Sequence, residues 1–188
     1  PVNILQTSEP EYFKVKQMGD KVGSLVACQA GQRWMWDGVE FEFLHPNASP
    51  PDYNPKFKNR NNLSCVLKVS NKKHSILLTG DIDSTTEKKL VKRVRDKLKS
   101  TVLIVAHHGS ASSSSQEFLE TVKPKYAWIG VGYLNRYQHP RQTVLDRLNK
   151  LNIPVVKTTE SGALSVSFTE DKILSLKQYQ FKTRRFWH

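Results

Sequence analysis

Residues 101–115, TVLIVAHHGSASSSS, are an apolar run followed by two adjacent histidines and a serine-rich turn. An unbroken apolar run of this kind is typical of a buried strand, and His107 and His108 follow at its carboxyl end. Adjacent imidazoles have no packing role there, whereas α/β sheets place their sites at the carboxyl ends of strands. The stretch therefore predicts an α/β fold with both histidines in its functional site.

Strands and helices alternate on both sides of this stretch. Upstream, ILLTGD (76–81) predicts a strand, and KKLVKRVRDKLK (88–99) has the periodicity of an amphipathic helix with a solvated basic face. Continuous apolar strands separated by helices indicate mixed sheets flanked by helices. Helices are expected over 84–99, 115–122 and 142–151, and further strands over 126–132 and 155–159.

The flanking segments show other patterns. Residues 1–21 have no clear periodicity and predict a loop or a short helix. The proline- and asparagine-rich segment 46–62 predicts a loop too long for a simple connector, so it is expected to cover another part of the molecule. Strands are expected over 22–46, as hairpins around Gly31 and Asp37-Gly38, and over 64–69, 161–169 and 172–181.

Two further candidate ligands follow neighbouring strands. Asp81 ends ILLTGD, and His139 lies in the loop after YAWIGVG (126–132). Taken alone, Asp81 is also the residue type that caps a helix, and His139 precedes Pro140 in the manner of a helix start. Imidazole nitrogen and carboxylate oxygen are ligands of zinc and of manganese-type centres. Because three successive strands supply these groups at one sheet edge, together they predict a divalent-metal hydrolytic site.

The net charge of +12 has two explanations. A phosphate backbone attracts such an excess, which favours nucleic acid as a partner, whereas a solubility role requires no partner at all. The segment 169–188 interleaves basic and aromatic residues, a composition that suits stacking on bases or a poorly ordered tail. A metallo-hydrolase of small molecules is disfavoured by this charge only weakly.

Cys28 and Cys65 do not have the short spacing of a metal-ligand pair. They are either two free buried thiols or a disulfide between strands, which would indicate an oxidising compartment. At 188 residues and 38% hydrophobic content the chain is long enough for one domain. It holds neither a run of about 20 apolar residues that would span a membrane nor a signal-peptide pattern.

Several motifs resemble one known family. LLTGDID, VAHHGSASSSS and GVGYLNRYQHP, with QRWMWDGVEFEFLHP and NNLSCVL upstream, are similar to the carboxyl-terminal metallo-β-lactamase-like domain of the ComEC competence proteins. The resemblance runs from about Cys28 to Phe168. It implies that 1–188 is a partial αβ/βα sandwich, and that the complete domain is a metal-dependent nuclease that degrades the non-transported strand of incoming DNA. It also implies a membrane-embedded parent protein in the bacterial inner membrane.

The resemblance assigns roles to individual residues. Asp81 matches the aspartate that bridges two metals, manganese or zinc, and His108 and His139 match metal ligands. His107, His108 and Asp81 form the implied catalytic set. The implied substrate-binding and orienting residues are Ser110, Asn135, Arg136, Tyr137 and Arg141.

The cysteines agree with the family's pattern, whereas the first metal motif departs from it. The cysteines match the family's C…G…W and N-N-x-S-C patterns, which implies a Cys28–Cys65 disulfide and a periplasmic position. The superfamily's first metal motif, H-x-[HSD]-x-D-H, occurs nowhere in the sequence and is expected before Pro1. We therefore expect the chain alone to bind metal weakly or not at all and to be inactive. The alternative function is a metal-free DNA-binding module with a vestigial site.

Overall fold

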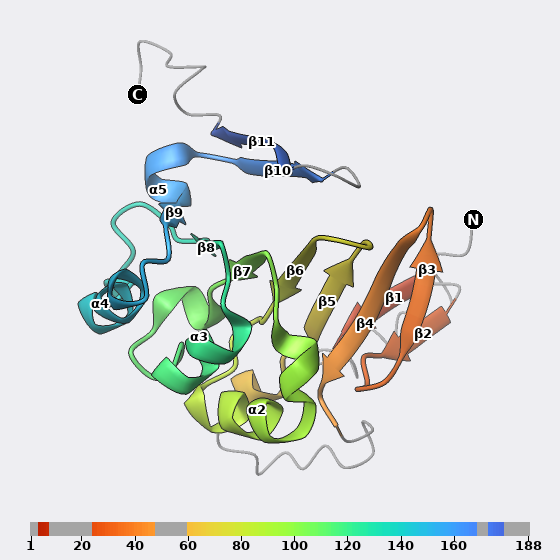
Figure 1. The fold of residues 1–188 in the computed structure, drawn as a ribbon. Coiled ribbons are helices and arrows are strands. Elements are labelled where there is room, and N and C mark those ends of the chain that lie inside the picture. Colours follow the sequence, from red (N-terminus) through yellow and green to blue (C-terminus); the bar gives the residue numbers. More distant parts are fainter. Residues whose placement is uncertain (1–3, 8–23, 48–59, 169–172, 179–188) are drawn as a thin grey trace.

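The computed structural model describes residues 4–7, 24–47, 60–168 and 173–178. Its centre is a seven-stranded mixed sheet in the order β3-β4-β5-β6-β7-β8-β9, shown in Figure 1. The first four of these strands are antiparallel neighbours, and β6 to β9 run parallel. The strands are β3 Arg33–Trp36, β4 Val39–His45, β5 Val66–Ser70, β6 Ser75–Leu78, β7 Val102–Ile104, β8 Tyr126–Ile129 and β9 Val155–Lys157.

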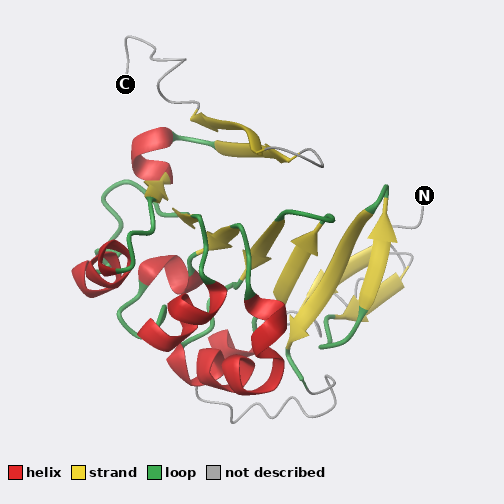
Figure 2. Cartoon of the chain, in the orientation of Figure 1, coloured by secondary structure: helices red, strands yellow, loops and turns green. Residues whose placement is uncertain are grey.

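Helices connect the parallel strands, as parallel pairing requires. The helix α2, Ser84–Leu98, joins β6 to β7; α3, Gln116–Val122, joins β7 to β8; and α4, Gln142–Lys150, joins β8 to β9. Figure 2 shows these helices gathered along one side of the sheet. The expected α/β class with helices flanking a mixed sheet is confirmed. Shorter helical turns are η3 Arg60–Leu63, η4 Ala106–Gly109 and α5 Thr158–Ser161.

One hydrophobic core joins the sheet to all three long helices. The amphipathic pattern of α2 is confirmed, because Leu90, Val91 and Leu98 are buried while Lys88 and Lys92 on the other face are exposed. The transfer of these apolar side chains out of water is the main force that holds the helices on the sheet. The core also contains Leu77, Leu103, Ala127 and Ile129 from the sheet, Phe118, Leu119 and Val122 from α3, and Val144 and Leu148 from α4.

The amino-terminal part differs from the expectation. Strand β1, Ile4–Thr7, pairs in parallel with β2, Ser24–Ala27, so the prediction of a loop or short helix over 1–21 was wrong for these four residues. Four residues are too few to carry a periodic signal. The hairpin at Asp37-Gly38 is confirmed between β3 and β4, whereas no hairpin forms at Gly31, because β2 pairs with β1.

The carboxyl-terminal strands form a separate antiparallel pair, β10 Leu164–Phe168 with β11 Ile173–Gln178, as expected. Of the basic aromatic segment 169–188 the structure describes only β11, and the rest lies outside the described residues. The same holds for 48–59 in the expected covering loop.

Cys28 and Cys65 form a disulfide with their Cα atoms 6.1 Å apart. This confirms the disulfide and excludes the two free thiols. The bond ties the segment after β2 to the residue before β5, next to the loop that carries η3. Within the described ranges, no helix is both long and apolar enough to cross a membrane.

Candidate functional site

The predicted site residues meet at one edge of the sheet. Strands β6, β7 and β8 are parallel neighbours in register, so the segments that follow them emerge side by side. Asp81 follows β6, His107 and His108 follow β7, and His139 lies in the loop after β8. The backbone N–H of His107 donates to the carbonyl of Gly80 at 3.0 Å, which fastens the first two segments together.

His108 and Asp81 form the centre of this arrangement. The Nδ1 atom of His108 lies 2.6 Å from the carbonyl oxygen of Gly130, and a carbonyl only accepts, so Nδ1 carries the proton. The other ring nitrogen, Nε2, then has a free lone pair in the neutral imidazole and lies 3.7 Å from Asp81 Oδ1. Two electron-rich atoms face each other, which favours a proton or a cation between them. The carbonyl fixes the ring in the orientation that metal-binding histidines need.

The backbone around the histidines is held in an uncommon conformation. His107, His108 and Gly109 have φ values of +49°, +54° and +81°, three consecutive residues in the left-handed region. Non-glycine residues adopt this region at a cost of about 1–3 kcal/mol each, and such strain gathers at functional sites. A Cβ on Gly109 would come within 2.6 Å of Pro140 Cβ, so the loop of His139 packs directly on this turn.

His107 and His139 lie beside each other in the site. Their ring centroids are 5.9 Å apart, edge to face. The side-chain amide Nδ2 of Asn61 donates to His107 Nε2 at 3.3 Å, which leaves the proton of His107 on Nδ1. The Nδ1 atoms of both histidines are buried without a hydrogen-bond partner within the described part of the chain. Such orphaned nitrogens are uncommon in folded proteins and point to a ligand in the site.

The pKa of His139 is lowered from its ordinary value, which favours the neutral form of its imidazole. Loss of solvent is the largest cause, and the charges of His107, Arg141 and His108 act in the same direction. Asp81 opposes the shift. A neutral imidazole retains the lone pair that a metal or a proton would use.

The turn η3 and the residue after it support the site, and the sequence reasoning did not assign them this role. Asn61 contacts His107, and Ser64 Oγ accepts from the backbone N–H of Asp81 at 3.1 Å. Asn62 exchanges two hydrogen bonds with Asp83, of 2.9 and 3.0 Å. In the stretch NNLSC (61–65), the sequence pattern indicated a role only for the cysteine. The polar residues directly before Cys65 were the feature that could have indicated a supporting role.

Asp83, and not Asp81, caps helix α2. Its carboxylate accepts from the backbone N–H groups of Thr85 and Thr86. Asp81 is therefore free of the capping role that was its alternative explanation, and its side chain is 41% exposed at the site.

The remaining predicted residues lie around the cluster with different contacts. Asn135 holds its own loop, because its side chain bonds the backbone N–H and the carbonyl of His139 at 2.9 and 2.8 Å. Tyr137 stacks on His139 with centroids 5.8 Å apart, and the Arg136 guanidinium lies over the Tyr137 ring. Arg141 donates to Gln138 from an exposed position. The Ser110 hydroxyl contacts that of Ser112.

A buried carboxylate supports the serine-rich turn behind the histidines. Glu87 on α2 is fully buried and accepts from the backbone N–H groups of Ser114 and Ser115, the latter at 2.7 Å. Arg147 on α4 donates to the carbonyls of Ser113 and Ser114. The turn is thus fixed by two helices, and the histidines before it are fixed with it.

The donor set is incomplete for a closed metal site. Asp81 Oδ1 and His108 Nε2 have the chemistry and nearly the separation of two ligands on one ion. Across the residues that the structure describes, however, no group of three or more histidine, cysteine, aspartate or glutamate side chains is placed to hold a metal.

Known proteins were compared with the chain. It is 41% identical over 154 residues to competence protein ComA of Neisseria gonorrhoeae, an overlap of 81% of this chain and 21% of that protein. It is 33% identical over 178 residues to ComE operon protein 3 of Bacillus subtilis, covering 94% of this chain and 20% of that protein. The chain thus spans about a fifth of the length of these relatives. No family model matches it.

Solved structures overlap more loosely. A metal-dependent hydrolase from Parabacteroides distasonis, described as putative, covers 76% of this chain and 61% of its own, at 12% identity and a TM-score of 0.47. The diiron β-hydroxylase CmlA of Streptomyces venezuelae covers 80% of this chain and 36% of its own, at 8% identity and the same TM-score. Both TM-scores are low, so neither overlap bears on function. The similarity to competence proteins expected from the motifs is confirmed.

Proposed function

We propose that this chain carries part of a metal-dependent phosphodiesterase site with a metallo-β-lactamase-like fold, which hydrolyses the non-transported DNA strand during uptake. The observation that carries the proposal is the Asp81–His108 pair at the ends of two parallel strands, with Gly130 fixing the tautomer of His108. The similarity to competence proteins and the net charge of +12 support DNA as the substrate.

The metal would be held by Asp81 and His108, with His139 as the next candidate. Further ligands are required from outside the described cluster, and the H-x-[HSD]-x-D-H segment is the expected source. A bound manganese or zinc ion supplies Lewis-acid polarisation of a phosphoryl oxygen and a lowered pKa for water. We expect the chain alone to bind either ion weakly, and isothermal titration checks this. Tight stoichiometric binding would contradict the shared-ligand assignment.

The other residues bind and orient. Asn61 leaves the proton of His107 on its buried Nδ1, which has no hydrogen-bond partner within the described residues and would donate to an acceptor that enters the site. Arg136 and Arg141 are exposed on the same loop and hold non-bridging oxygens of the phosphodiester. Asn135 positions His139 through its two hydrogen bonds. We assign Ser110 a contact with the substrate at the edge of the histidine turn.

We further propose a periplasmic position, attached to a parent protein in the inner membrane. The Cys28–Cys65 disulfide supports it, because structural disulfides persist in oxidising compartments.

The test uses a protein that carries this chain behind an H-x-[HSD]-x-D-H segment. Asp81→Asn and His108→Ala should each lower the manganese-dependent cleavage of DNA by at least about a thousandfold, since each removes a ligand from the pair. Their circular-dichroism spectra should be unchanged, because both side chains are solvent-exposed and outside the core. Wild-type turnover in the folded Asp81 variant would refute the assignment.

A metal-free DNA-binding module is the second candidate, and the net charge of +12 supports it. It predicts salt-sensitive DNA binding with no cleavage under any divalent metal in that same longer protein. Metal-dependent cleavage of DNA by that longer protein would instead support the phosphodiesterase.

A further inference from the structure

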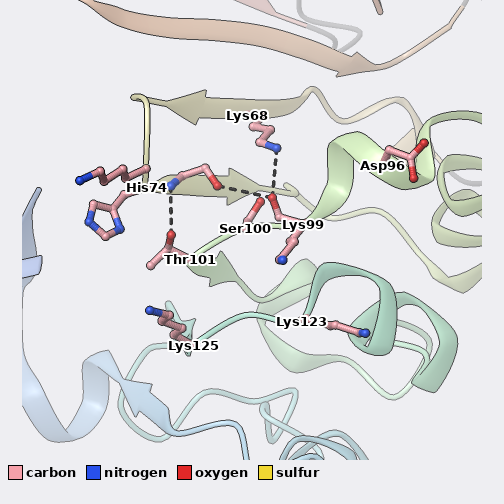
Figure 3. Close-up of a pocket in the computed structure, with 10 residues that line it drawn as sticks. Lys68, His74, Asp96, Lys99, Ser100, Thr101, Lys123 and Lys125 are labelled. Atoms are coloured by element: carbon pink, nitrogen blue, oxygen red, sulfur yellow. Dashed lines mark hydrogen bonds between the residues drawn. The ribbon is translucent and has the colours of Figure 1, made fainter. Parts of the chain in front are cut away.

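A cationic hollow lies at the opposite end of the central strands. It has a volume of about 370 Å³ and borders Ser75 and Thr101, at the amino ends of β6 and β7. Figure 3 shows side chains from several elements around it. The charged residues that line it are Lys68, Lys73, Lys99, Lys123, Lys125 and Asp96.

These lysines come from segments far apart in the sequence. Lys68 is on β5, Lys73 is in the turn between β5 and β6, and Lys99 follows α2. Lys123 follows α3, and Lys125 directly precedes β8. The fold therefore gathers five ammonium groups against the single carboxylate of Asp96. Within the described residues, no ion pair or hydrogen bond involves the side chains of Lys99, Lys123 or Lys125.

Helix ends explain only part of this charge. Lys68 Nζ donates to the carbonyls of Lys97 and Lys99, at 2.7 and 3.0 Å, and so caps the carboxyl end of α2. Figure 3 shows its ammonium pointing towards Lys99 and Ser100. Lys99 and Lys123 also lie at helix ends, where cations are favourable. Lys73 and Lys125 belong to a turn and a strand start, where no helix dipole favours them.

A second hollow continues the first. It has a volume of about 270 Å³, shares Asp96, Lys99 and Lys123 with the first, and adds Arg95 on α2 and Glu120 on α3. The shared residues join the two hollows into one cationic groove between the carboxyl ends of α2 and α3, lined by six cationic and two acidic side chains. A groove suits a chain of regularly spaced negative charges better than a single small anion.

We propose that this groove binds the phosphate backbone of a DNA strand, as a second site away from the histidine cluster. The choice of DNA as the ligand rests on the proposed function, whereas the groove itself is defined by its lining residues. From Ser75 at the groove to Asp81 at the histidine cluster the chain advances six residues, about 20 Å in extended form. At one phosphate per about 3.4 Å along each strand of a duplex, a duplex of roughly six base pairs covers that length, and a dinucleotide does not reach both places.

The experiment reverses the charge of the groove. The triple variant Lys99→Glu, Lys123→Glu, Lys125→Glu is compared with Lys88→Glu, Lys92→Glu, Lys150→Glu, which changes the same charge at exposed lysines elsewhere on α2 and α4. DNA binding is measured by fluorescence anisotropy in EDTA over a range of salt. We expect the groove variant to bind at least about tenfold more weakly and to lose about two to three units of salt slope, and the control less than about threefold.

A second variant guards against misfolding. The same three lysines changed to glutamine remove the charge without introducing acidic residues at two helix ends, and should weaken binding in the same direction by a smaller factor. Anionic lipid vesicles and inorganic phosphate serve as competing probes. Equal weakening of DNA binding in the groove and control variants overturns the proposal. A groove variant that binds anionic vesicles more weakly but binds DNA like the wild type overturns it as well.

The outcomes separate the two proposals. If the groove variants bind DNA like the wild type while Asp81→Asn abolishes cleavage in the longer protein with the H-x-[HSD]-x-D-H segment, the groove alone is refuted. If neither the wild type nor any variant binds DNA, both the groove and DNA as the substrate are refuted. In that longer protein, a groove variant that cleaves a dinucleotide normally but long DNA poorly supports the second site.

Discussion

The two ends of the central strands are built in opposite ways. At the carboxyl ends, His107, His108 and Gly109 are held in left-handed backbone conformations. Asn61 contacts the ring of His107, and Asn135 holds the backbone of His139. At the amino ends, lysines on long flexible stems surround an open groove. The difference teaches that this fold fixes imidazoles and a carboxylate where geometry matters, and collects adaptable charge where it does not.

Removing the disulfide is the test with the largest expected effect, because the bond lies beside the carboxyl-end site and not beside the groove. The bond closes a loop of 37 residues, so replacing both cysteines with alanine should lower the free energy of unfolding by about 3–4 kcal/mol. Denaturant unfolding measures the loss. DNA binding at the groove, which lies away from Cys65, should survive under conditions where the variant stays folded.

The control is reduction of the same proteins. A reducing agent should destabilise the wild type to the level of the double variant and leave the variant unchanged. Two titratable thiols in the unfolded, unreduced wild type would show that the bond does not form.

The contrast also explains what the sequence revealed. The apolar strands and the helices were predicted well, since α2 buries the face that its periodicity indicated, and α3 and α4 form within the expected ranges. Asp81, His107, His108 and His139 were found because strand ends are visible in sequence. Their supports were not, because Ser64 and Glu87 act through hydrogen bonds between segments that only the fold brings together.

The groove shows the same limit. Lys68, Lys99 and Lys125 stand in three different segments, and no local pattern joins them. The basic helix 88–99 was correctly expected to have a solvated face; only its last residues contribute to the groove. Strand β1 escaped prediction because its partner β2 is about 20 residues away and the strand itself is four residues long.

Gly109→Ala is the next largest test, aimed at the strained turn. The residue has φ +81°, and an added Cβ would meet Pro140 Cβ at 2.6 Å. Both the backbone and the contact must shift, so we expect a loss of about 2–3 kcal/mol in the free energy of unfolding. Gly132→Ala is the matched control, because its Cβ would have no atom within 4 Å. Equal stability of the two variants would show that the turn is not held by this packing.

Glu87→Gln is the smallest and most specific test, because it changes the support of the serine-rich turn without changing its shape. Glutamine offers one acceptor oxygen where the carboxyl group, protonated or ionised, offers two, so the backbone N–H of Ser114 or Ser115 loses its partner. The cost should be about 1–2 kcal/mol at acidic to neutral pH. Glu120→Gln, an exposed change on α3, should stay within about 0.5 kcal/mol of the wild type.

The pH dependence of that difference identifies its cause. Burial raises the pKa of Glu87 above its ordinary value of 4.5, and hydrogen bonds from Ser115 and Ser114 and the charge of Arg147 only partly oppose the shift. The folded protein therefore holds this proton to higher pH than the unfolded chain does. The stability that Glu87 contributes is fully present below pH 4.5 and falls as the pH rises through its folded pKa. Glutamine does not titrate, so the stability gap between wild type and Glu87→Gln should be widest near pH 4 and narrow towards pH 8. Urea unfolding of both proteins across that range measures the gap. A gap that stays constant would mean that Glu87 titrates alike in both states, and that burial does not govern this carboxylate.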